Sequence, residues 1–149
     1  MCTLLFVTSG NASGNGLSHS GKKQAKQVIP VLKSQIGEAK PVFMSATSNS
    51  VAATAKIVCD SFNHPFEKKG FLCSCTDCQN QQNNFGAYSF FKEHSPHTKV
   101  IVWFVDKHFI SKYALYVCGT ENIPYDAIHE SGEGEVWSFS PERKLEKIL

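Results

Sequence analysis

Short apolar runs alternate with longer segments of helical periodicity along this chain. The runs fall at residues 4–7, 42–44 and 100–105, and each ends in polar or small residues, as strands buried in a parallel sheet do. Between and after them, apolar residues recur every three or four positions, a spacing typical of helices that bury one face. The three predicted buried stripes are Ala25, Val28, Ile29, Leu32 and Ile36; Val51, Ala55, Val58 and Phe62; and Ile110, Tyr113, Ala114 and Val117.

Local signals set the ends of these helices. Pro30 is expected to kink or divide the first helix because proline removes a helical hydrogen bond. Ser48 and Asn49 are suited to cap the second. The third is predicted to begin near Lys107 and to end close to Gly119.

The alternation of strands and helices predicts an α/β fold, a three-layer α/β/α sandwich with a mainly parallel sheet. Residues 135–139 alternate in polarity and come late, so they predict a final edge strand. The polar stretch 76–84, with its run of Gln and Asn, predicts an exposed loop. The glycines at positions 10, 14 and 16 predict a flexible loop after the first strand.

Composition predicts one soluble domain over residues 1–149. Hydrophobic residues make up 42% and charged residues 19% of the chain, as in ordinary globular proteins. A net charge of +2 is too weak to predict nucleic-acid binding. No basic leader precedes the first strand and no apolar run reaches the ~20 residues of a membrane span. We therefore expect a cytoplasmic protein with no membrane partner and with reduced cysteines.

Arginine is almost absent from the chain. Of the fifteen basic residues, Arg143 is the single arginine, and it lies near the C-terminus. Arginine is favoured for phosphate binding because its planar fork offers paired donors in a fixed geometry. A phosphate pocket built on two inward-facing arginines therefore cannot be assembled from this sequence.

Several short sequence motifs nevertheless resemble those of the histidine phosphatase superfamily, whose members have a phosphoglycerate-mutase-like fold. The first strand runs into Thr8-Ser9-Gly10 where that family has Arg-His-Gly, and residues 17–25 match its Leu-Thr-x-x-Gly-x-x-Gln-Ala pattern. Residues 42–45 with Thr54-Ala55, and residues 100–105 with Cys118-Gly119, are similar to the next two strand–helix units. The short length and the tail from residue 125 are most similar to the compact SixA-type phosphohistidine phosphatases.

The resemblance places the family's catalytic positions on uncharged or acidic residues. The nucleophilic histidine corresponds to Ser9, the two pocket arginines to Thr8 and Ser50, and the second histidine to Asp106. Phosphoryl transfer needs positive charge around the equatorial oxygens. We therefore expect a catalytically degenerate protein, a binding or interaction module for an unknown small ligand or protein partner, without a cofactor or metal. Its expected binding residues are Thr8, Ser9, Gly10, Asn11, Ser50 and Asp106.

Four alternatives remain open on the residues alone. An active phosphatase with a rearranged site would use Ser9 as nucleophile with Asp106 as base, or would return His108 to the pocket through a bulge. The segment Gly16 to Lys23 imitates a nucleotide-binding loop, but Lys23 stands where a magnesium-binding hydroxyl is required.

The cysteine-rich segment carries the remaining alternative. Cys73, Cys75 and Cys78 lie within six residues, a density that is also found in metal sites. Only Cys75 and Cys78 have the spacing of a zinc ligand pair, so we expect reduced cysteines in a loop without a structural metal.

Overall fold

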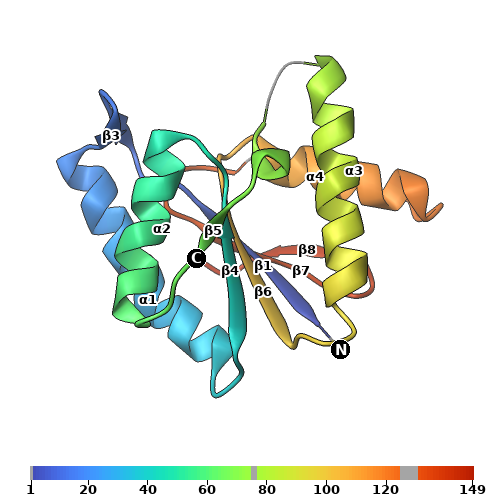
Figure 1. Ribbon diagram of the computed structural model, residues 1–149, viewed down its shortest axis with the longest axis horizontal. Helices are drawn as coiled ribbons and strands as arrows, with labels where there is room; N and C mark the ends of the chain where they lie inside the picture. Colours follow the sequence, from blue (N-terminus) through green and yellow to red (C-terminus); the bar gives the residue numbers. More distant parts are fainter. Residues whose placement is uncertain (1, 75–76, 125–130) are drawn as a thin grey trace.

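The computed structural model describes residues 2–74, 77–124 and 131–149, and for residues 77–81 it describes the backbone alone. Its centre is a six-stranded sheet in the order β5-β4-β6-β1-β7-β8 (Figure 1). These strands are β1 (Thr3–Thr8), β4 (Pro41–Ser45), β5 (Glu67–Lys68), β6 (Val100–Val105), β7 (Val136–Phe139) and β8 (Leu145–Lys147). The first four run parallel to one another, whereas β7 pairs antiparallel with both β1 and β8.

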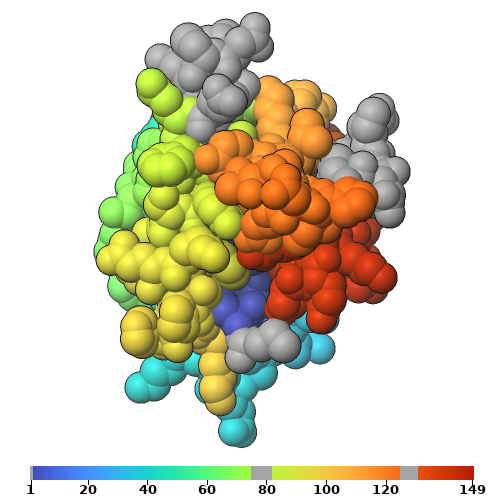
Figure 2. Space-filling view, turned by 90° about the vertical axis from the view of Figure 1, so that its right-hand side faces the viewer, coloured from blue at the N-terminus to red at the C-terminus, as the bar shows by residue number. Residues whose placement is uncertain are grey.

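Helices cover both faces of this sheet. Helices α1 (His19–Ile36) and α2 (Asn49–Ser61) pack together on one face, and α3 (Asp77–His94) and α4 (Phe109–Thr120) on the other (Figure 1). Figure 2 shows α3 and α4 side by side on the outer surface of their layer. The predicted three-layer α/β/α sandwich with a mainly parallel sheet is therefore confirmed. Among the described helices, none has the length and apolar character that crossing a bilayer requires.

Complementary apolar faces hold the layers together. All six residues of β6 are buried, as expected for a strand covered on both sides. An aromatic cluster fills the space between the sheet and α4: Phe6, Trp103, Phe109, Tyr113 and Phe139 have ring centroids 5.2–6.4 Å apart. Rings at these separations add to the stability from burial itself. The core fixes the strands whose ends carry the candidate site.

The helices follow their sequence signals closely. Helix α1 continues through Pro30 as one helix, with the predicted stripe buried except for the half-buried Ile29. Ser48 is the N-cap of α2, although its side chain makes no capping hydrogen bond. Helix α4 begins and ends within two residues of the predicted bounds.

Two of the predicted local structures are wrong. Most of the stretch 76–84 is helical, because α3 begins at Asp77. This helix is held by its second half, where Ala87 and Phe91 are buried against the core, and glutamine tolerates a helix well. The run 135–139 forms β7 from residue 136, but β7 is not an edge strand. Residues 145–147 form β8 beside it and become the edge.

The glycine-rich loop after β1 is more ordered than its composition predicts. It contains the small hairpin β2 (Ala12–Ser13) and β3 (Gly16–Leu17), with Gly14 in the left-handed region at φ 58°. Gly21 lies inside α1 rather than in a loop. The resemblance to a nucleotide-binding loop is therefore wrong, because no open phosphate loop precedes the helix.

Candidate functional site

The expected site residues gather at the carboxyl ends of β1 and β6. These strands pair in parallel register up to Thr8 and Val105, and the Ser9 N–H donates to the Val105 carbonyl at 3.1 Å. Ser9 and Asp106 therefore follow neighbouring strand ends. Open α/β sheets place their ligands at this edge.

Helix α2 reaches the same edge through the buried hydroxyl of Thr54. Thr54 Oγ1 accepts the Gly10 N–H at 3.1 Å and donates to the Ser50 carbonyl at 3.0 Å. The structure thus links Ser50 to the loop that carries Ser9 and Gly10. That these residues bind a ligand remains a prediction.

Residues that match the family motifs have a structural role at this edge of the sheet. Gly10 and Gly21 cross so closely that a Cβ on Gly10 would lie against the Gly21 carbonyl and 2.8 Å from its Cα. The neighbouring Asn11 N–H donates to Gln24 Oε1 at 2.8 Å. Gly10, Gly21, Gln24 and Thr54 all match the resemblance, and all hold the backbone of the loop. These four residues therefore have a structural role in this fold.

Thr8 has a structural role at the end of β1. Its side chain is fully buried, and Oγ1 accepts the backbone N–H of Glu135 at 2.8 Å. The Thr8 N–H donates to the Glu135 carbonyl at 2.9 Å, and the Gly134 N–H donates to the Ser9 carbonyl at 2.9 Å. The segment that enters β7 is therefore fastened to the end of β1.

Thr8→Val is expected to lower the free energy of unfolding by about 1–3 kcal/mol, because it leaves the Glu135 N–H without its acceptor while preserving side-chain volume. Thr8→Ser keeps the hydroxyl and should cost about 1 kcal/mol for the lost methyl group. Urea denaturation of both variants, with amide exchange of Glu135, measures the difference. Equal stability of Thr8→Val and wild type, with unchanged exchange, would contradict this role.

Glu135 itself is tied into the sheet edge. Burial alone would raise the pKa of its carboxyl group, but hydrogen bonds from the Gly132 N–H, the Trp137 indole and Lys147 outweigh burial and lower that pKa. The carboxylate therefore stays ionised while it organises the turn that Thr8 holds.

Asp106 places a negative charge at the start of α4. Its Oδ1 accepts the His108 N–H at 2.8 Å, and its carbonyl accepts the Phe109 N–H at 3.1 Å. A carboxylate at a helix N-terminus satisfies unpaired donors and complements the helix dipole. His108 itself is exposed at the N-cap position. The position that the resemblance assigns to a phosphate-binding histidine thus carries a helix-capping anion.

Three basic residues on and around α4 have partners other than Asp106. Lys107 pairs with Glu133 at 3.1 Å, and Lys112 contacts Ser74 Oγ at 3.4 Å. Arg143 binds Glu121 with 2.7 and 2.8 Å contacts, beyond the far end of the 12-residue helix α4. Since a helix rises about 1.5 Å per residue, the single arginine lies roughly 18 Å from the strand ends.

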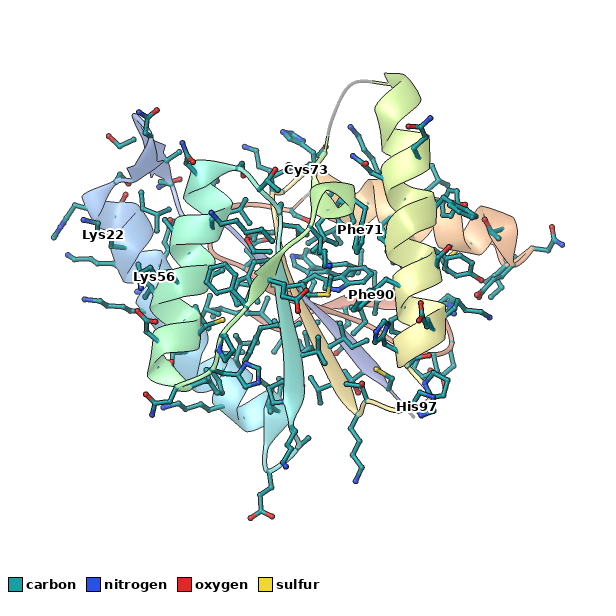
Figure 3. All side chains as sticks on the ribbon, in the orientation of Figure 1. Lys22, Lys56, Phe71, Cys73, Phe90 and His97 are labelled. Carbon is teal, nitrogen blue, oxygen red and sulfur yellow. The ribbon has the colours of Figure 1, made fainter. Side chains whose placement is uncertain are left out.

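Cys73 joins this edge, which the sequence did not predict. Its Sγ lies 3.4 Å from the Thr47 N–H and 3.0 Å from Thr47 Oγ1, just before α2 (Figure 3). The two residues are 26 positions apart, so no local pattern signals the contact. Among the described residues there is no group of three potential metal ligands. Cys75 and the Cys78 side chain lie outside that description, so the absence of a metal stays a prediction.

A separate groove of about 670 Å³ runs along the outer edge of β4. Its lining includes Phe43 of β4, His64 and Phe66 of the segment before β5, and Phe90 and His94 of α3. The groove follows the side of the sheet rather than the carboxyl ends of β1 and β6. It is therefore distinct from the candidate site.

Comparison with solved structures identifies the fold. Over 99% of this chain and 96% of the other, the structure is similar to the Mycobacterium tuberculosis protein of open reading frame Rv3214, with a TM-score of 0.70 and 12% identity. The match to mycobacterial glucosyl-3-phosphoglycerate phosphatase in complex with VO3 has a TM-score of 0.71 and 12% identity, over 100% of this chain and 97% of the other. The match to a mutant of Entamoeba histolytica phosphoserine phosphatase with bound phosphoserine has a TM-score of 0.65 and 9% identity, over 100% of this chain and 96% of the other.

These neighbours are members of the histidine phosphatase superfamily. The chain therefore has the phosphoglycerate-mutase-like fold that the sequence predicted. No family model and no curated protein matches the sequence.

Proposed function

We propose that this chain is a catalytically degenerate protein of the histidine phosphatase fold that serves as a binding or interaction module. The observation that carries the proposal is the Asp106 carboxylate, which caps α4 where the resemblance expects a phosphate-binding histidine. A carboxylate at this place repels a phosphate dianion by several kcal/mol in a partly desolvated site. Thr8, at the position of a pocket arginine, is buried and hydrogen-bonded.

The strand-end residues favour a different kind of ligand. Ser9, Asn11 and Ser50 are half-buried and uncharged, and Asp106 is half-buried and acidic. Hydroxyl and amide groups beside one carboxylate suit a neutral or cationic group with hydrogen-bond donors. This set supports a small polar ligand or a partner's side chain rather than a phosphoester.

An active phosphatase is the second candidate, because solved structures with this fold include a glucosyl-3-phosphoglycerate phosphatase and a putative α-ribazole-5'-phosphate phosphatase. It requires Ser9 as nucleophile and a base to activate it. Asp106, the carboxylate that the resemblance places beside Ser9, accepts the His108 N–H, and a carboxylate alone activates a serine hydroxyl poorly. We therefore rank this candidate second.

Hydrolysis of p-nitrophenyl phosphate and of phosphohistidine by the purified protein is expected to equal the buffer control, because neither a histidine nucleophile nor an arginine clamp is present. Amide NMR shifts during a phosphate titration should be negligible at Ser9 and Gly10. The variant Asp106→Asn, which keeps an N-capping oxygen without the charge, should bind phosphate more tightly than wild type. Turnover that Ser9→Ala or His108→Ala abolishes would refute the proposal.

A further inference from the structure

Charge is divided unequally between the two ends of the sequence. Residues 1–59 contain six lysines and one acidic residue, Glu38, whereas residues 60–149 contain nine basic and twelve acidic residues. The first part supplies α1 and α2, which form one outer layer of the molecule (Figure 1). The excess of positive charge therefore belongs to one face.

Helix α1 carries most of this charge without any acidic residue. Its four lysines are exposed, and none forms an ion pair within the described part of the chain, whereas five other basic residues do. At 100° per residue, Lys22, Lys26 and Lys33 fall within an arc of about 40° along about 16 Å of helix. They form a single line of charge, which we call the basic stripe.

The basic stripe borders α2 and apolar surface. Lys33 Nζ lies 5.8 Å from the ring centroid of Phe62, the C-cap residue of α2. Phe62 and Ile29 are half-buried beside it. Figure 3 shows Lys22 on α1 and Lys56 on the adjacent α2, both in the layer on this side of the sheet. Lysine stems cover apolar surface while their ammonium groups remain in water.

We infer that the basic stripe is a docking surface for an acidic, partly apolar segment of a protein partner. Carboxylates complement the line of ammonium groups, which form no ion pair with described residues, and apolar partner side chains complement Phe62 and Ile29. An extended segment of about five residues spans the stripe. Membrane binding is disfavoured because it needs apolar side chains that insert, and among the described side chains the most exposed large apolar ones, Phe85 and Leu115, lie on α3 and α4.

The inference goes beyond the proposed function, because the stripe lies outside the strand-end site. A fluorescein-labelled peptide of alternating Glu and Leu tests it by anisotropy at low ionic strength. The triple variant Lys22→Glu, Lys26→Glu and Lys33→Glu should weaken binding at least about tenfold, since three attractions become repulsions. The control triple variant Lys68→Glu, Lys99→Glu and Lys144→Glu has the same net charge as the stripe variant. Its affinity for the peptide should stay within about twofold of wild type if the position of the charge matters.

Binding should also fall as ionic strength rises past about 0.15 M, where the screening length is about 8 Å. A Lys→Gln version of the stripe variant, checked by circular dichroism, separates lost charge from misfolding. The inference is overturned if the peptide does not bind, or if both triple variants weaken binding equally. It is also overturned if a thymidine oligonucleotide or phosphatidylserine vesicles bind the stripe more tightly than the peptide. Phosphatase turnover would refute the proposed function and leave this result unchanged.

Discussion

Replacing Gly10 by alanine is expected to lower the free energy of unfolding by at least about 3 kcal/mol. The new Cβ would meet the backbone of Gly21, with the Gly21 Cα at 2.8 Å. Backbone atoms cannot move aside as a flexible side chain can, so the loop and α1 would have to separate. That separation would break the hydrogen bond from the Asn11 amide to Gln24 of α1.

Gly21→Ala should have the same effect, although alanine in a helix interior is normally about 1 kcal/mol better than glycine. Its Cβ would lie 2.9 Å from the Asn11 nitrogen. Gly16→Ala is the matched control in the same loop, because nothing lies within 4 Å of its Cβ. Urea denaturation followed by circular dichroism compares the three variants. If Gly10→Ala and Gly21→Ala are as stable as Gly16→Ala, the close approach of the Gly10 and Gly21 backbones does not contribute to stability.

Breaking the ion pair between Arg143 and Glu121 is expected to cost about 1.5–3 kcal/mol, because removing one partner leaves a partly buried charge without its hydrogen bonds. The two side chains are only 11% and 21% exposed. Arg143 donates twice to Glu121, and the Tyr88 hydroxyl donates to the same carboxylate at 2.6 Å. Arg143→Met and Glu121→Gln should therefore both destabilise the fold strongly.

An exposed ion pair supplies the control for this measurement. Lys56 and Asp60 are 72% and 67% exposed, so Lys56→Met should change stability by less than about 0.5 kcal/mol. Thermal or urea denaturation of the single variants, and of Arg143→Met combined with Glu121→Gln, gives the coupling energy. A coupling near zero would show that the buried pair contributes nothing specific.

The same cluster predicts a pH dependence. Hydrogen bonds from Arg143, which outweigh burial, and from Tyr88 lower the pKa of Glu121. A lowered folded-state pKa gives stability that is present above the unfolded pKa and is lost as pH falls through the folded pKa. Wild type should therefore lose stability more steeply than Arg143→Met between about pH 5 and pH 3.

Tyr88 predicts a second loss of stability at alkaline pH. Burial, then the hydrogen bond to Glu121, raises its pKa from 10.0 to about 12. Its contribution to stability is present below pH 10 and is lost as pH rises through about 12.

Local sequence patterns were sufficient for the scaffold. Apolar runs and helical stripes predicted β1, β4, β6, α1, α2 and α4, because burial follows the periodicity of each element. The sequence also showed the near absence of arginine, and it predicted that Ser9 and Asp106 follow the ends of strands. These features depend on residue identity and on short spacings, which the chain carries whatever its fold.

Other features depended on which distant segments meet. The Asn- and Gln-rich start of α3 is helical because Ala87 and Phe91 bury the end of the same helix, and β7 is interior because the short β8 pairs beside it. The tertiary structure also decided that Thr8 serves the Glu135 N–H, 127 positions away, and that Asp106 caps α4. The sequence by itself determined that the positions matching the family's catalytic residues hold hydroxyl groups and one carboxylate. Only the fold decided what these polar groups bind, because those partners are set by packing across the sheet edge rather than by neighbours in the chain.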